Sequence, residues 1–106
     1  MTSSVSSKVL VVHCKRVKYD VYIGRAMPGM AGSPFANPFK IGEDGTRDEV
    51  LKKYEAYIRA RPDLLELLPT LKGKVLGCWC APKKCHGDIL IKLINELEVE
   101  QKFFVF

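Results

Sequence analysis

The sequence lacks any long hydrophobic run, because charged or polar residues interrupt its apolar segments every few positions. A helix that crosses a bilayer needs about 20 consecutive apolar residues, so we expect no membrane-spanning helix. The N-terminal stretch has no basic region ahead of its first apolar segment, which argues against a secretory signal peptide. We therefore expect a cytoplasmic protein that has no membrane partner.

Repeated segments and sustained heptads are also missing, which excludes repeat arrays and coiled coils. The chain has 106 residues, of which 47% are hydrophobic and 27% are charged. That length and composition suit one ordinary folded domain with a single core. We expect a flexible N-terminus over residues 1–7, one domain over 8–98, and a C-terminal tail or edge strand over 99–106.

Three segments have the composition of β-strands. Residues 8–14 form a continuous β-branched and apolar run, which favours a central strand that is covered on both faces. Residues 19–25 alternate and end at a glycine, as a second strand would. Residues 71–80 are predicted to form the third strand, entered through Gly73.

Helical patterns lie between and after these strands. Thr46 and Glu49 have the spacing of a capping box, and the helix that they start ends before Pro62. Residues 63–68 and 86–98 are predicted to form two further helices. The order of elements predicts a compact single-domain α/β fold with two or three layers. We expect its Rossmann-like sheet to have mostly parallel strands and to pack against two to three helices.

The net charge is +5, and the basic residues are concentrated in two blocks. Residues 8–25 contain five basic residues and one acidic residue, while residues 72–84 contain four basic residues and no acidic one. Such blocks suit a polyanion or nucleotide phosphates, although a small soluble domain can also carry a modest positive excess. The candidate phosphate-binding and ligand-binding residues are Arg25, Asn37, Arg47, Lys83, Lys84, Lys15 and Arg16.

Three of the four cysteines lie within residues 78–85. In a reduced compartment, clustered cysteines favour metal binding or thiol chemistry over disulfides. Zinc is the candidate cofactor, because it prefers tetrahedral sites made of cysteine and histidine. The candidate ligands are Cys78, Cys80, Cys85 and His86, and either His13 or Cys14 could replace one of them.

The same segment also suits a reactive thiolate. Cys85 stands where the helix 86–98 begins, so the helix dipole would lower the pKa of its thiol. His86 would then act as the base, with Asp88 nearby. A third interpretation is plain packing, in which the cysteines are small buried hydrophobic residues and His86 and Asp88 merely start the helix.

Residues 26–40 contain three prolines and two glycines and are predicted to form a long irregular loop. Arg25 precedes this loop and could bind a phosphate or form a surface salt bridge. Asn37 could either fix a turn or contact a ligand. The spacing of Tyr54, Tyr57 and Trp79 favours a place in the core over a role in stacking on bases.

Four motifs occur in a characteristic order: VYIGR at 21–25, NPF at 37–39, GTRDEV at 45–50 and Cys-x-Pro-x-x-Cys-His-Gly-Asp at 80–88. Together they resemble a family of small domains of unknown function found in phages, prokaryotes and some eukaryotes. The resemblance covers roughly residues 8–97 and implies a compact Rossmann-like α/β fold without an established activity. The family's polar motif positions correspond to Tyr22, Arg25, Asn37, Thr46, Arg47, Cys80, Cys85, His86 and Asp88.

Two functions follow as hypotheses. The first is a small basic module that binds RNA or another polyanion, stabilised by a zinc-binding Cys/His cluster. It could belong to a ribosome or another ribonucleoprotein as a stabilising or dormancy factor. The alternative is an enzyme that processes a nucleotide or nucleoside, with Cys85 or Cys80 as the reactive thiol. His86 and Asp88 would assist that thiol, and Arg25 with Asn37 would hold the substrate.

Overall fold

The computed structural model describes residues 9–81 and 83–104. The predicted flexible segment 1–7 lies outside these ranges. The elements follow one another in the order β1 (Leu10–His13), β2 (Val21–Tyr22), α1 (Arg47–Arg59), α2 (Pro62–Leu67), the 3-10 helix η2 (Leu68–Leu71), β3 (Val75–Cys78) and α3 (His86–Phe104).

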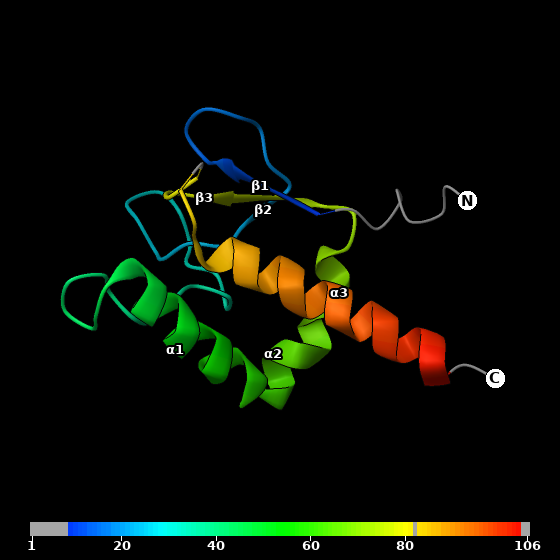
Figure 1. Ribbon diagram of the computed structural model, residues 1–106. Coiled ribbons are helices and arrows are strands. Elements are labelled where there is room, and N and C mark those ends of the chain that lie inside the picture. Colours follow the sequence, from blue (N-terminus) through cyan, green and yellow to red (C-terminus); the bar gives the residue numbers. More distant parts are fainter. Residues whose placement is uncertain (1–8, 82, 105–106) are drawn as a thin grey trace.

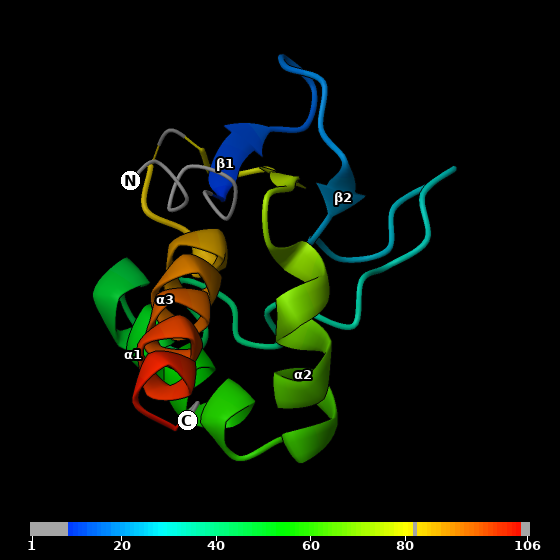
Figure 2. The ribbon, with the colours of Figure 1, turned by 90° about the vertical axis from the view of Figure 1, so that its right-hand side faces the viewer.

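The three strands form one sheet in the order β1-β3-β2, and both pairings are parallel. The three α-helices lie on the same side of this sheet, which gives the molecule two layers (Figures 1 and 2). The predicted compact α/β fold is therefore confirmed. Since parallel strands run in one direction, β1 and β3 have their carboxyl ends at the same end of the sheet, beside the first turns of α1 and α3 (Figure 1).

The central strand is β3, and the prediction that residues 8–14 form it was wrong. In the described part of the chain, β1 pairs with β3 along one edge alone. Leu10 of β1 is 48% exposed, whereas Leu76 and Cys78 of β3 are fully buried. A continuous apolar run shows that a strand packs well, but it does not show which strand has neighbours on both sides.

The second and third strands are shorter than the predicted 19–25 and 71–80. Strand pairing in β2 covers only Val21–Tyr22, although the amide of Ile23 still donates to Gly77 O at 3.0 Å. Before β3, residues 68–71 form a 3-10 helix, and Gly73 then reverses the chain with a φ of 73°. A φ in this left-handed region suits glycine, because it has no Cβ to clash.

Helix α1 begins at the predicted capping box. Thr46 Oγ1 accepts from the amide of Glu49 at 3.2 Å, and Glu49 Oε1 accepts from the amide of Thr46 at 2.8 Å. The helix buries Val50, Tyr54 and Ile58 against the core. Tyr54 is thus a core residue, as predicted, and its hydroxyl donates to Phe35 O at 2.6 Å.

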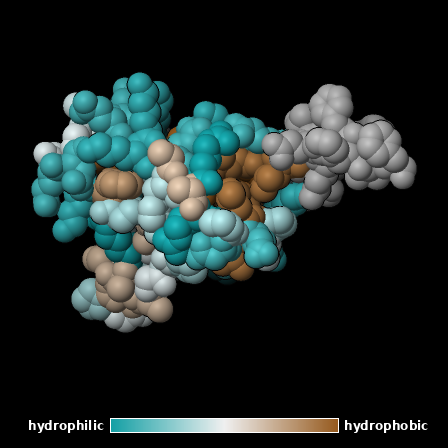
Figure 3. All heavy atoms as spheres, turned by 90° about the horizontal axis from the view of Figure 1, so that it is seen from below, coloured by the Kyte–Doolittle hydropathy of each residue, from teal (hydrophilic) through white to brown (hydrophobic). Residues whose placement is uncertain are grey.

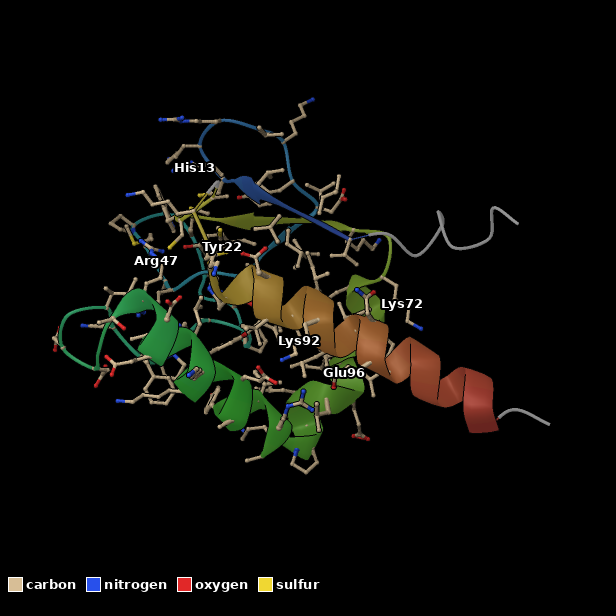
Figure 4. All side chains as sticks on the ribbon, in the orientation of Figure 1. His13, Tyr22, Arg47, Lys72, Lys92 and Glu96 are labelled. Carbon is tan, nitrogen blue, oxygen red and sulfur yellow. The ribbon has the colours of Figure 1, made fainter. Side chains whose placement is uncertain are left out.

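Helix α3 buries Leu90, Leu93 and Ile94 against the same core. An ion-pair network joins α3 to α1. Arg59 contacts Glu55 at 2.8 Å and Glu96 at 2.9 Å, and Lys92 contacts Glu55 at 3.1 Å. Figure 4 shows Lys92 and Glu96 on the part of α3 that lies above α1.

The predicted tail or edge strand over 99–106 is instead helical through Phe104, while residues 105–106 lie outside the described ranges. The sequence contains no proline or glycine between residues 98 and 104 that would end the helix. None of the helices in the described ranges has the length and apolar character to cross a membrane. The surface on the helical side is mostly hydrophilic (Figure 3). A cytoplasmic location stays a prediction.

The capping box gives a stability prediction. Replacing Thr46 with alanine removes the oxygen that accepts from the amide of Glu49, so we expect Thr46→Ala to lower the free energy of unfolding by about 1 kcal/mol. Thr46→Ser keeps a hydroxyl there and should stay within a few tenths of a kcal/mol of the natural protein. Urea denaturation followed by circular dichroism measures both, and equal losses would contradict the capping role.

Candidate functional site: a basic cavity at the strand ends

A cavity of about 510 Å³ lies where the strands end and the helices α1 and α3 begin. Its walls come from three segments of the chain, within residues 22–27, 37–51 and 79–86. The volume is typical of sites that bind small molecules. Most of the motif residues that carry the family resemblance line it, namely Tyr22, Arg25, Asn37, Arg47, Cys80, Cys85 and His86.

Arg25 holds the long loop against the end of β2. Its Nε donates to Asn37 O at 3.0 Å and its Nη2 donates to Phe39 O at 2.8 Å. The side chain of Asn37 fixes the same turn, because its Oδ1 accepts from the amide of Phe39 at 2.9 Å. Arg25 therefore has a positioning role, and the remaining guanidinium donors and the Asn37 amide nitrogen are left for a ligand.

Trp79 forms part of the cavity wall and is held there by Tyr22. The Trp79 Nε1 donates to Tyr22 Oη at 2.7 Å, and that hydroxyl donates to Arg25 O at 2.7 Å. The indole is 38% exposed, so the expectation that Trp79 belongs to the core was wrong. Trp79 follows the last residue of β3, where the chain bends away from the sheet and leaves the ring at the surface.

Positive charge predominates in the cavity wall. Four basic side chains (Arg25, Lys40, Arg47 and Lys84) line it together with one carboxylate, that of Glu43. Arg47 Nη1 donates to Lys84 O at 2.7 Å, which ties the first turn of α1 to the segment that precedes α3. Figure 4 shows Arg47 and Tyr22 at the same end of the molecule. The arrangement favours an anionic ligand.

His86 is the buried polar residue of the site, with only 8% of its surface exposed. Its Nε2 lies 2.6 Å from Ile23 O. A carbonyl oxygen can only accept, so Nε2 carries the proton and Nδ1 keeps its lone pair. Burial disfavours the charged imidazolium and lowers the pKa of His86, so the ring is neutral near pH 7. The edge of the Tyr54 ring packs against it at a centroid distance of 5.1 Å.

Residues 85–88 form the cap of α3. The amide of Gly87 donates to Cys85 Sγ at 3.3 Å, and Asp88 Oδ2 accepts from the amide of Cys85 at 3.0 Å. The arrangement is related to a capping box, but the cysteine thiol accepts from the second amide of the helix and an aspartate takes the place of glutamate. Asp88 is thereby engaged at the helix start and is absent from the cavity wall, where the predicted catalytic role would require it.

Gly87 allows the start of α3 to approach the sheet closely. A Cβ at this position would lie 2.8 Å from Val11 Cγ2 and 3.0 Å from Ile23 Cδ1. Real side chains do not pack this tightly, so a larger residue would push the helix or its neighbours away. The glycine of the Cys-His-Gly-Asp motif thus sets the distance at which His86 meets Ile23.

Cys85 also contacts Cys78, with their Sγ atoms 3.1 Å apart and both side chains buried. The hydrogen bond between the two thiols lowers the pKa of Cys78, whereas the same bond together with burial raises the pKa of Cys85. A buried thiol that holds its proton is a weak nucleophile. The geometry therefore disfavours Cys85 as the reactive group.

The four predicted zinc ligands are not gathered around one point. Within residues 9–81 and 83–104, no group of three or more histidine, cysteine or acidic side chains could hold a metal ion. Cys78 and Cys85 contact each other, whereas the Nε2 of His86 is engaged with Ile23 and Cys80 lies in the cavity wall. Cys80, Cys85 and His86 line the cavity, and Cys78 is buried against Cys85.

Of the other predicted phosphate ligands, one lines the cavity and three lie outside it. Lys84 lines the cavity, while the exposed Lys83 beside it does not. Lys15 and Arg16 are exposed in the loop between β1 and β2, outside the cavity. Trp79 and Phe39 line the cavity although neither was predicted as a site residue, and the NPF motif is the signal that could have indicated Phe39.

A family model described as a domain of unknown function, DUF4326, matches residues 11–96. The chain belongs to this family. The predicted resemblance to a small family of unknown function is thereby confirmed. The cavity described above lies within the DUF4326 domain, since all its lining residues fall in the matched range.

Two viral proteins are similar to this DUF4326 chain. "Uncharacterized protein R718" of Acanthamoeba polyphaga mimivirus is 40% identical over 91 residues, which cover 74% of this chain and 69% of the relative. The "Uncharacterized 12.4 kDa protein in nrdA-td intergenic region" of Enterobacteria phage T4 is 33% identical over 100 residues. That match covers 90% of this chain and 85% of the relative. No solved structure matches the chain.

The thiol geometry predicts the reactivity of Cys85. Because its side chain is buried and its pKa is raised, we expect Cys85 to be alkylated more slowly at pH 7.5 in the folded protein than in urea. Iodoacetamide labelling followed by peptide mass spectrometry measures each cysteine separately. Faster labelling in the folded protein would restore Cys85 as a candidate nucleophile.

The buried imidazole predicts how stability depends on pH. The unfolded chain binds a proton at His86 near pH 6.5, whereas the folded protein does so only at lower pH. Stability should therefore fall as the pH drops below about 6.5, and the fall should be smaller in His86→Gln, which cannot titrate. Unfolding free energies of the two proteins between pH 7.5 and 5 measure this, and parallel profiles would contradict it.

Proposed function

We propose that the cavity binds a nucleotide or a nucleoside phosphate. The observation that carries this proposal is the composition of the wall, where four basic side chains and one carboxylate line the same cavity as the exposed Trp79. Nucleotides combine an anionic phosphate with a flat aromatic base. A wall that offers both cations and an aromatic surface matches these two parts of one ligand.

Arg47 and Lys84 are the proposed phosphate ligands. Arg47 uses Nη1 to hold Lys84 O, and its other nitrogens have no acceptor within the described residues. The guanidinium is thus held in place at one corner and presents its remaining donors. Lys84 is exposed and lines the cavity, and its carbonyl keeps it beside Arg47.

Base recognition is assigned to other residues of the wall. Trp79 offers a stacking surface, and Phe39 provides a second aromatic ring. The Oδ1 of Asn37 is engaged with Phe39, so the amide nitrogen of Asn37 can donate to a ring nitrogen or a carbonyl of the base. His86 also lines the cavity, and the lone pair on its Nδ1 is the ring acceptor that remains for an N–H or O–H group of the ligand.

His86 is also the group in this cavity that is suited to accept a proton from the ligand. It is neutral at pH 7, its tautomer is fixed by Ile23, and it lines the cavity. If the protein processes its nucleotide, proton transfer by His86 fits the geometry better than attack by Cys85, whose thiol serves the helix cap. The sequence-based hypothesis made Cys85 or Cys80 the reactive group and His86 its helper, whereas here His86 itself would exchange the proton with the ligand.

Trp79 is the single tryptophan of the chain, so its fluorescence reports binding directly. We expect saturable quenching by at least one of the four ribonucleoside 5′-monophosphates and weaker quenching by the matching nucleoside. Lys84→Ala should weaken binding of the monophosphate at least about tenfold, because a charge-assisted hydrogen bond contributes roughly 1.5–3 kcal/mol and about 1.4 kcal/mol corresponds to a factor of ten.

Lys83→Ala is the matched control. Lys83 is the neighbour of Lys84 in the sequence and carries the same charge, but its side chain does not line the cavity. Its affinity should stay within about twofold of the natural protein. Equal losses in the two variants would show a general charge effect, and no saturable quenching by any nucleotide would refute the proposed function.

A further inference from the structure

We infer that the ligand is one nucleotide of a single-stranded nucleic acid, whose flanking phosphates contact the loop between β1 and β2. This inference rests on the proposed nucleotide-binding cavity. The loop forms a second basic surface outside the cavity, and its cations are the residues that a free nucleotide would leave unused. We define the basic loop as residues 14–18.

The basic loop presents charge that the protein does not neutralise. Lys15, Arg16 and Lys18 are exposed, and none of them forms an ion pair within the described residues. The carboxylate of Asp20, which follows the basic loop, accepts from the amide of Val75 at 2.8 Å and is engaged at the start of β3. Exposed Val17 lies between these cations. A polyanion would gain several phosphate contacts here.

The start of the basic loop is held to the sheet. The amide of Cys14 donates to Cys78 O at 2.9 Å, and the amides of Arg16 and Val17 donate to His13 O at 3.0 and 3.1 Å. The side chain of His13 contributes as well, because its Nδ1 accepts from the amide of Lys15 at 3.1 Å. The backbone that carries Lys15 and Arg16 is therefore held beside the end of β3.

The basic loop adjoins the cavity through Trp79. Lys15 Nζ lies 5.7 Å from the centre of the Trp79 ring, and the ring of His13 lies 5.8 Å from it. Trp79 lines the cavity, so one aromatic residue is shared between the two surfaces. Figure 4 shows His13, Tyr22 and Arg47 at one end of the molecule and Lys72 at the other.

An aromatic residue beside a row of cations suits a single-stranded nucleic acid. Proteins bind them by stacking bases on aromatic side chains and by placing basic residues along the phosphates. In the inferred complex, one base enters the cavity beside Trp79, its own phosphate contacts Arg47 and Lys84, and the neighbouring phosphates contact Lys15 and Arg16. A duplex would keep its bases stacked and paired and could not insert one without unpairing it.

The test compares a free nucleotide with an oligonucleotide. A labelled eight-nucleotide RNA containing the preferred base, the DNA of the same sequence and the corresponding duplexes are titrated by fluorescence anisotropy. The monophosphate is titrated by Trp79 quenching. At 150 mM salt we expect the single strand to bind at least tenfold more tightly than the monophosphate and the duplex. The RNA and DNA arms show which sugar the site accepts.

The decisive variant is the double substitution Lys15→Ala/Arg16→Ala. It should weaken oligonucleotide binding about tenfold and reduce the slope of log affinity against log salt by about 1.4, or roughly 0.7 for each lost phosphate contact. Its affinity for the monophosphate should stay within twofold. The matched control is Lys72→Ala/Lys74→Ala, which removes the same charge at the opposite end of the sheet and should leave both affinities within twofold.

The outcomes separate this inference from the proposed function. Binding of the monophosphate without tighter binding of the single strand would overturn the inference and leave the cavity as a site for a free nucleotide. Equal losses in the two double variants would also overturn it, because attraction would then depend on net charge alone. Failure of both the monophosphate and the oligonucleotide to bind would refute the proposed function itself.

Discussion

The hydrogen bond between His86 and Ile23 is the contact on which the site depends. It joins the first residue of α3 to the residue that follows β2, at a distance of 2.6 Å. The bond is buried, so losing it would leave polar groups without water or partner, which costs more than a surface bond would. It also fixes which nitrogen of His86 holds the proton. The same contact therefore positions the helix and sets the chemistry available in the cavity.

Around this bond, the motif residues divide the work between support and recognition. Cys85, Gly87 and Asp88 cap α3 and let it approach the sheet, while Arg25 and Tyr22 hold the loop and Trp79 in place. These five residues hold the helix, the loop and Trp79 in fixed positions, and we call them the frame of the site. Arg47, Lys84 and Asn37 then offer their remaining donors to the cavity from positions that the frame determines. Contacts that restrain a side chain before a ligand arrives reduce the conformational entropy that binding would cost, and this applies to Arg47 and Asn37.

Residues of the two basic blocks lie in different places, some in the cavity wall and others on the surface beside it. Lys84 from the second block lines the cavity, while Lys15 and Arg16 from the first block remain at the surface beside Trp79. Their proximity depends on the parallel pairing of β1 with β3, which brings both strand ends to the same edge of the sheet. The RNA-binding and nucleotide-binding hypotheses, which composition alone presents as alternatives, therefore concern adjacent surfaces of one molecule. Association with a ribosome stays a prediction.

Local patterns in the sequence were enough to predict the capping box at Thr46, because it depends on residues that are near one another in the chain. The α/β class and the parallel strands followed from the order of strands and helices, since a helix that connects two strands favours their parallel pairing. The place of β1 at the edge, the exposure of Trp79 and the pairing of Cys78 with Cys85 depend on contacts between distant segments. The motif identified the residues of the site, but not their roles. Only the packing of α3 against the sheet decided that Cys85 and Asp88 form a cap and that His86, Arg47 and Lys84 line the cavity, since burial and hydrogen bonding determine what each side chain can still bind.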